Sequence, residues 1–333
     1  MKTPFGKYGI RMLAVALPLL LVACATDVRM PPKNLISFGD SLSDLGTYSP
    51  RNAAVGGGKF TVNPGPIWVE AVARHYDLKI GPNRTGGWGF PISVMGGTAY
   101  GEGGSRVSQQ PGSNNTDASK GPGSGQTTRP VREQINTHLA SHGGKFQPED
   151  MVLVWAGAND VFRHVLFAPA PSQEVAEDRT RETADELVAD VRRMVAAGAR
   201  RMVILNLEDY GSTPSARSAG AEKAALLTAV GRAFNAQLAK GLTGTGALLV
   251  DVERLYSRIK EEPARFGLTN VRDQACRLTE LPMRSVTYCT RETLVSPEAA
   301  VTYLYADGVH PSPAGHRIIA EHVLSMLDAK GKE

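Results

Sequence analysis

Short, continuous apolar runs that alternate with longer amphipathic segments are the feature that most limits how this chain can fold. The runs lie at residues 34–38, 151–155, 202–207 and 247–252. Runs of this length without polar interruption are typical of strands buried on both faces, as in a parallel sheet. Helical periodicity occurs at residues 131–141, 174–197, 221–242, 252–262 and 314–330. The alternation predicts βαβ units, and therefore an α/β fold with a central, mostly parallel sheet between two layers of helices.

Two stretches follow neither pattern. Residues 49–97 are rich in Gly, Pro and Asn, and only residues 67–76 look helical there. Residues 108–130 consist largely of Gly, Ser, Thr, Gln and Asn, so we expect an exposed, mobile loop. The chain contains no internal repeat, and we expect residues 34–330 to form one domain that includes this loop.

The amino-terminal residues resemble an export signal. Basic residues precede an apolar run at 12–23, which is too short to span a membrane that needs about 20 helical residues. Residues 21–24, Leu-Val-Ala-Cys, resemble a bacterial lipobox, which implies cleavage before Cys24 and a lipid on its sulfur. An ordinary signal peptide that adjoins a cysteine is the alternative. Ala25 follows, and by resemblance to the bacterial sorting rule this predicts an anchor in the outer membrane, on its periplasmic or exterior side.

Removal of the predicted signal, residues 1–23, changes the charge balance. The full chain has 37 basic and 33 acidic residues, and the signal holds three basic ones, so 37 − 3 leaves 34 against 33. A net charge near +1 gives no reason to expect a nucleic acid partner. What remains is a short tether at 24–33 and enough chain for one large α/β domain.

Two cysteines, Cys276 and Cys289, remain once Cys24 is assigned to the lipid. In an oxidising compartment we expect them to form a disulfide, and two free buried thiols are the alternative. No cysteine or histidine pair has the spacing of a zinc site, so no metal is expected.

Segments near the two ends of the chain hold the groups that acyl-transfer chemistry needs, namely a nucleophilic hydroxyl, an imidazole base and a carboxylate that orients the imidazole. Ser41 follows the first predicted strand, where its hydroxyl can be exposed beside backbone N–H groups. Asp307 and His310 are three residues apart, so the carboxylate can reach Nδ1 while Nε2 points at the serine. Taken singly, the serine also fits a helix N-cap and the Asp–His pair an ordinary turn. His316 is a rival base, but no carboxylate lies three residues before it.

Two intermediate motifs add to this pattern. Residues 99–105 are dense in glycine where a strand should end, as expected where a backbone N–H must approach a substrate closely. Gly-Ala-Asn-Asp at 157–160 follows the predicted strand at 151–155 and places the amide of Asn159 at its carboxyl end, where ligands bind in open α/β sheets. Either motif alone also fits an ordinary turn.

In this order, the four motifs resemble the sequence blocks of the SGNH (GDSL) hydrolase family, of the bacterial secreted and lipoprotein esterase–lipase type. The resemblance covers residues 34–325 and implies a flavodoxin-like three-layer α/β/α domain. It implies that Ser41 is the nucleophile, His310 the general base and then acid, and Asp307 its orienting partner.

The resemblance also implies the oxyanion donors. These are the N–H groups of Ser41 and Gly104 and the side-chain amide of Asn159, with the adjacent Gly103 as the alternative to Gly104. Secreted bacterial members resemble this chain in carrying a cysteine pair ahead of the last block. They usually have a tryptophan where this chain has Ala306, which leaves the packing around the aspartate open.

The implied activity is hydrolysis of carboxylic esters through an acyl-enzyme, with simple esters or lipids as substrates and no cofactor. Lysophospholipase and carbohydrate acetyl esterase are alternatives within this chemistry. A non-catalytic surface lipoprotein that binds a partner through residues 49–130 is the alternative of another class. The sequence lacks a G-x-S-x-G elbow, an H-E-x-x-H pair and a Walker A loop, so other catalytic folds have little support. The oligomeric state does not follow from the sequence.

Overall fold

The computed structural model describes residue 1 and residues 31–113, 128–166 and 172–331. Cys24, the predicted signal and most of the predicted loop at 108–130 lie outside the described residues, so these assignments stay predictions. Within the described part of the chain, none of the helices has the length and apolar character needed to cross a membrane.

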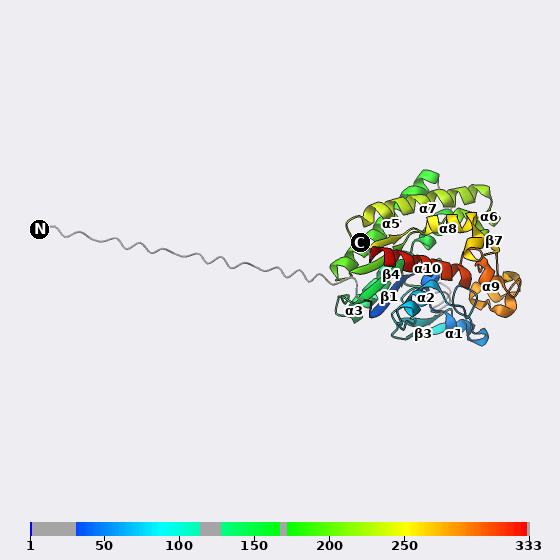
Figure 1. The fold of residues 1–333 in the computed structure, drawn as a ribbon, viewed down its shortest axis with the longest axis horizontal. Coiled ribbons are helices and arrows are strands. Elements are labelled where there is room, and N and C mark those ends of the chain that lie inside the picture. The colour runs from blue at the N-terminus through cyan, green and yellow to red at the C-terminus, as the bar shows by residue number, and fades with distance from the viewer. Residues whose placement is uncertain (2–30, 114–127, 167–171, 332–333) are drawn as a thin grey trace.

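Four parallel strands form the central sheet, in the order β1-β4-β5-β6. Strands β1 and β4 lie side by side in Figure 1. Their bounds are β1 Asn34–Gly39, β4 Asp150–Trp155, β5 Arg201–Leu205 and β6 Leu248–Val250. Ala99 makes a further parallel bridge to Ser37 of β1. This arrangement confirms the predicted α/β class with a central parallel sheet.

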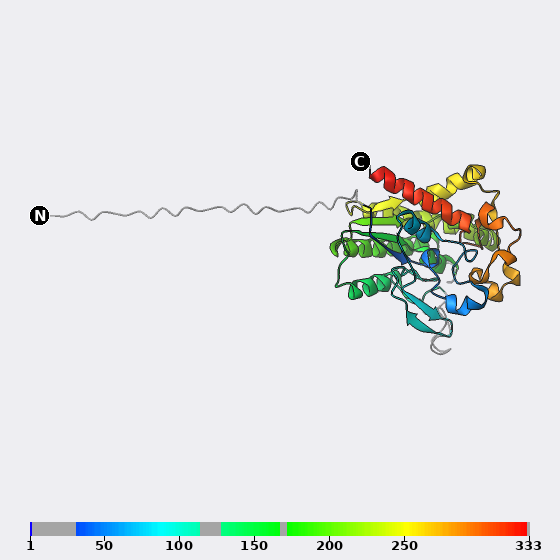
Figure 2. The same cartoon turned by 60° about the horizontal axis from the view of Figure 1, so that its bottom comes forward.

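Each face of the sheet carries its own apolar core, because alternate side chains of a strand point to opposite faces. Ile36 and Val152 belong to the core shared with α3, α4, α5 and α7. Leu35 and Leu153 belong to the core shared with α2, α8 and α10. The bounds are α2 Trp68–His75, α3 Val131–Ser141, α4 Ala158–Leu166, α5 Gln173–Ala196, α7 Ala221–Leu242, α8 Val252–Glu261 and α10 Pro313–Lys330. Figure 2 shows helices on both sides of the sheet, with α10 in red along one side.

The predicted regular elements are present with small shifts at their ends. The helices predicted at 131–141 and 221–242 match α3 and α7 to the residue, and the others differ by one or two residues. Strands β5 and β6 end earlier than predicted because side chains take over the hydrogen bonding beyond them. Asn206 donates to Asp251 at 3.0 Å, and Asp251 caps α8 by accepting from the N–H of Arg254.

Several elements were not predicted. They are the helices α1 Ser49–Asn52, α4, α6 Pro214–Ala219 and α9 Ala299–Thr302, the hairpin of β2 Arg84–Gly87 and β3 Phe90–Val94, and the parallel pair of β7 Asn270–Gln274 and β8 Tyr303–Tyr305. The expectation of a single helix in residues 49–97 was therefore wrong. All five residues of β3 are exposed, so the alternation of Phe90, Ile92 and Val94 with Pro91 and Ser93 does not mark a buried face of the strand.

Candidate active site

Ser41 lies just beyond the carboxyl end of β1, where a 3-10 turn at Ser41–Ser43 begins. Asp40 caps this turn by accepting a hydrogen bond from the N–H of Leu42 at 3.0 Å. Ser41 is 9% exposed, and it lines a cavity of about 220 Å³. The serine predicted from the sequence therefore faces a site that a small molecule can enter.

His310 brings the carboxyl-terminal part of the chain to this serine. Its Nε2 lies 2.8 Å from Oγ of Ser41, across 269 positions of sequence, and its Nδ1 lies 2.7 Å from Oδ2 of Asp307. The other carboxylate oxygen of Asp307 accepts hydrogen bonds from the N–H groups of Val309 and His310, at 2.8 and 2.6 Å. These bonds fix the carboxylate, so that hydroxyl, imidazole and carboxylate form one continuous chain of hydrogen bonds.

The surroundings adjust the protonation of this pair. Burial disfavours the charged imidazole of His310, but the charge and hydrogen bond of Asp307 outweigh burial and raise its pKa above the ordinary value. Burial also disfavours the charged carboxylate of Asp307, yet the charge and hydrogen bonds of His310 lower its pKa. The two residues therefore stabilise each other in their charged forms, which is the arrangement needed when the imidazole takes up a proton.

His316, the rival base, lies elsewhere. It is fully buried in α10, and its Nδ1 accepts the N–H of Trp68 at 3.3 Å. Burial, together with the charges of His310 and Lys59, lowers the pKa of His316 to about 3. A neutral, buried histidine that receives a backbone hydrogen bond is part of the packing between α2 and α10.

Gly104 and Asn159 line the same cavity as Ser41 and His310. Asn159 donates through Nδ2 to the carbonyl of Ser105 at 2.9 Å. An amide nitrogen carries two hydrogens, so a second one is available to a group in the cavity. Gly104 has a φ of +86°, a left-handed conformation that glycine adopts without strain.

Gly103, the alternative to Gly104, has its N–H directed elsewhere. That N–H donates to Oδ2 of Asp44 at 2.8 Å. A Cβ at Gly103 would also collide with the ring of Phe60. Of the two glycines, Gly104 is the one that faces the cavity.

Sequence reasoning missed the residues that support the site. Phe60 packs its ring against the imidazole of His310, with centroids 5.1 Å apart. Asp160, buried in α4, accepts hydrogen bonds from Arg106 Nε at 2.8 Å and from the N–H of Val107 at 2.9 Å. It thereby holds the segment that follows Gly104. Asp160 belongs to a predicted motif, but nothing local in the sequence identifies its partner or the packing role of Phe60.

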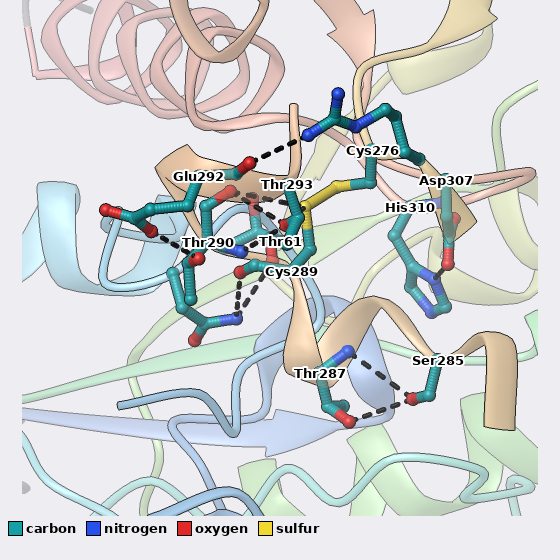
Figure 3. The surroundings of a disulfide bond; sticks show 12 residues. Thr61, Cys276, Ser285, Thr287, Cys289, Thr290, Glu292, Thr293, Asp307 and His310 are labelled. Atoms are coloured by element: carbon teal, nitrogen blue, oxygen red, sulfur yellow. Dashed lines mark hydrogen bonds and ion pairs between the residues drawn. A yellow bond between two sulfur atoms is a disulfide. The ribbon is translucent and has the colours of Figure 1, made fainter. Parts of the chain in front are cut away.

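The predicted disulfide joins Cys276 and Cys289 and lies beside the Asp307–His310 pair (Figure 3). The N–H of Cys276 donates to the carbonyl of Ala306 at 3.0 Å, and the N–H of Ala306 donates to the carbonyl of His310 at 2.8 Å. The cross-linked segment thus holds the backbone on which the carboxylate and the imidazole sit. Ala306 is fully buried in the same apolar cluster as the two cysteines.

No described residues form a cluster of three or more His, Cys, Asp or Glu side chains suited to a metal ion. The groups around the cavity are instead a hydroxyl, an imidazole, a carboxylate and N–H donors. In chemical terms, this set can carry out nucleophilic acyl transfer.

Comparison with known proteins gives the class of this chain. A family model described as GDSL-like lipase/acylhydrolase matches residues 35–323. The chain belongs to this family, which confirms the resemblance seen in its motifs, and it is a carboxylic ester hydrolase.

Individual relatives are distant. The phosphatidylcholine-sterol acyltransferase of Aeromonas hydrophila is 27% identical over 77% of this chain and 69% of its own length. Esterase EstA of Pseudomonas aeruginosa is 26% identical over 96% of this chain and 51% of its own, so this chain spans only about half of that protein. A crystal structure described as that of a GDSL-like lipase from Parabacteroides merdae is 13% identical, with a TM-score of 0.45 over 91% of this chain and 99% of that one.

Proposed function

We propose that this protein hydrolyses carboxylic esters through a covalent acyl-enzyme on Ser41. The observation that carries the proposal is the chain of hydrogen bonds from Ser41 Oγ to His310 Nε2, at 2.8 Å, and from His310 Nδ1 to Asp307 Oδ2, at 2.7 Å. A hydroxyl is a weak nucleophile until a base removes its proton, and this geometry supplies that base.

The reaction has two halves. Ser41 Oγ attacks the carbonyl carbon of the ester while His310 Nε2 takes the hydroxyl proton. The tetrahedral intermediate collapses, and the alcohol leaves with the proton that His310 returns. Water then attacks the acyl group on Ser41, with His310 again as base, and releases the carboxylic acid. Asp307 holds the imidazole in the tautomer with its proton on Nδ1 and stabilises the imidazolium that forms in each half.

The oxyanion is assigned to three donors, namely the N–H groups of Ser41 and Gly104 and the Nδ2 group of Asn159. Their common position on the cavity wall, with Gly103 engaged by Asp44, supports this choice. Donors fixed in advance stabilise the charge that develops in the transition state. We expect Asn159→Ala to lower kcat by about 10²–10³-fold.

Lysophospholipase and carbohydrate acetyl esterase activities use the same chemistry and differ in the acyl group and the alcohol. A lipid anchor on Cys24, in the outer membrane, belongs to the same proposal, as does a single domain at 34–330. Replacement of Cys24 by serine should release the protein from the membrane fraction and abolish incorporation of labelled palmitate. If the Cys24→Ser variant stays in the membrane fraction and still incorporates palmitate, the proposed lipid anchor is wrong, and the proposed ester hydrolysis is unaffected.

Kinetics of Ser41→Ala on p-nitrophenyl esters test the proposal. We expect kcat to fall on the order of 10⁴-fold or more, because the nucleophile is gone while the fold is unchanged. Ser43→Ala is the matched control, since its buried Oγ has no hydrogen-bond partner among the described residues. A Ser41→Ala variant as active as Ser43→Ala would contradict the mechanism, and a wild-type protein without activity would favour the non-catalytic binding alternative.

A further inference from the structure

The cavity beside Ser41 continues beyond the reacting groups into an apolar chamber. Ser41, Gly104, Asn159 and His310 line one end of it. Three helices, α4, α6 and α7, and the turn that precedes α6 supply much of the remaining wall, and Leu42, Phe60, Ser113 and Val309 supply the rest. The space therefore extends from the nucleophile into the helical layer on one face of the sheet.

Most of these walls are apolar, although the hydroxyl-bearing residues Tyr210, Thr213 and Ser215 also line the cavity. Phe162 of α4, Ala216 of α6 and Leu227 of α7 all contribute to the lining, and Leu227 is 1% exposed. The ring of Phe162 packs against that of Tyr210, with centroids 4.7 Å apart. None of the described residues that line the cavity is Asp, Glu, Lys or Arg. Such walls favour a neutral aliphatic group and disfavour a charged one.

We propose that this chamber binds the acyl chain of the substrate, and that the preferred substrates are esters of medium-chain fatty acids. This inference rests on the proposed function, since it needs the scissile carbonyl at Ser41. An acyl group bonded to Oγ of Ser41 can enter the chamber directly, because Ser41 and the apolar wall residues line the same cavity. The alcohol then leaves toward solvent.

The size of the chamber sets the chain length. An apolar cavity of about 150 Å³ in another protein holds benzene, which has six carbon atoms. The cavity of about 220 Å³ in this protein is larger by half, so it accepts an aliphatic chain of about six to eight carbons. An acetyl group would leave most of it unfilled, which argues against an enzyme built for acetylated sugars.

A series of p-nitrophenyl esters from acetate to palmitate tests the proposal on the wild-type protein. Each methylene that enters the chamber should raise kcat/KM by up to about fourfold, with a maximum at hexanoate or octanoate and a decline beyond. A profile that peaks at acetate, or that keeps rising to palmitate, would overturn the proposal.

Ala216→Leu adds three carbon atoms to the chamber wall. We expect it to lower the ratio of kcat/KM for octanoate over acetate by about 10- to 60-fold, because up to three methylenes lose their place. Ala225→Leu makes the same change at an exposed position of α7 that does not line the cavity, and its ratio should stay at the wild-type value. An unchanged ratio in Ala216→Leu would contradict the proposal.

Leu227→Ala is the opposite change and guards against a variant that fails to fold. Its enlarged chamber should move the maximum toward longer chains, such as decanoate. The ratio of kcat/KM for octanoate over acetate tests the acyl chamber, whereas the activity of Ser41→Ala tests the proposed mechanism. If Ser41→Ala is inactive but the Ala216 and Leu227 variants keep the wild-type chain-length profile, the acyl chamber is wrong and the nucleophile is right. If Ser41→Ala is active, the mechanism fails first.

Discussion

Gln134 binds both backbone groups of Gly39 through its side-chain amide. Its Oε1 accepts the N–H of Gly39 at 3.0 Å, and its Nε2 donates to the carbonyl of Gly39 at 2.8 Å. The same Nε2 lies 2.9 Å from Oγ of Ser105, which follows Gly104. One fully buried side chain of α3 therefore ties the end of β1, two residues before Ser41, to the segment that contains Gly104.

Gln134→Ala should lower the free energy of unfolding by about 2–4 kcal/mol, because it removes buried hydrogen bonds to Gly39 and Ser105 and leaves the carbonyl of Gly39 with the N–H of Glu102. It should also lower kcat, since the turn that begins with Ser41 and the segment that contains Gly104 lose their common support. Urea unfolding and ester kinetics measure the two effects. Gln237→Ala, which removes an exposed hydrogen bond to Asp185, is the control and should change stability by less than about 0.5 kcal/mol. If Gln134→Ala and Gln237→Ala lose equal amounts of stability and activity, Gln134 does not support the two segments.

The pH dependence of kcat/KM should report His310. The base must be neutral, so activity falls as the pH drops through the pKa of His310, which lies above its ordinary value of 6.5. Asp40 is buried close by; burial raises its own pKa to about 7, and its charged form contributes to the rise at His310. Asp40→Asn keeps an oxygen to cap Leu42 but removes the charge, so the acid limb of the profile should move to lower pH. Asp178→Asn on the surface of α5 is the control and should leave the pH profile unchanged. If the acid limb of the Asp40→Asn profile stays at the wild-type pH, Asp40 does not influence the pKa of His310.

Glu208 follows β5 and is fully buried, close to the hydroxyl of Tyr256 and the ammonium group of Lys260. Burial raises its pKa from 4.5 to about 8, despite the attraction of Lys260. Between these values the folded state keeps a proton that the unfolded state loses. The contribution of Glu208 to stability is therefore complete below about pH 4.5 and is lost as the pH rises toward 8.

Glu208→Gln removes this dependence. From about pH 5 to about pH 8, its free energy of unfolding should decline less than that of the wild type, by on the order of 3 kcal/mol. Urea unfolding across this range measures the difference. Glu222→Gln, at an exposed position of α7, should follow the wild-type curve. Parallel curves for Glu208→Gln and the wild type would show that Glu208 titrates alike in both states.

The Cys276–Cys289 bridge should stabilise the fold by roughly 3 kcal/mol, as expected for so short a closed loop. Replacement of both cysteines by serine should lower the midpoint of thermal unfolding by about 5–10 °C. Reductant should lower the midpoint of the wild type to a similar degree and leave the double variant unchanged. A double variant that still responds to reductant would show that the effect does not come from this bridge.

Elements marked by a local sequence pattern could be predicted, whereas contacts between segments far apart in the sequence could not. Helices α3 and α7 were predicted to the residue because their periodicity is local. The proximity of Ser41, Asp307 and His310 was predicted because each lies in a motif with its own spacing. Phe60 could not be predicted, since its contact with His310 joins segments 250 residues apart that only the fold brings together.

Gln134 did leave a signal in the sequence. It shares one face of α3 with Val131, Ile135 and His138, all of which are buried. A polar side chain at a core-facing position of an amphipathic helix needs a partner inside the protein. The helix pattern thus indicates a buried amide, but its partner Gly39 lies 95 positions away and can be identified only from the structure.

The contact between Ser41 and His310 is the basis of this account, and a fluorophosphonate probe tests it most directly. After reaction with the wild-type protein, peptide mass spectrometry should find one adduct, on Ser41, and His310→Ala should slow its formation by orders of magnitude. Hydrolysis of esters by a protein that carries its adduct on another serine, or that forms none, would contradict the assignment.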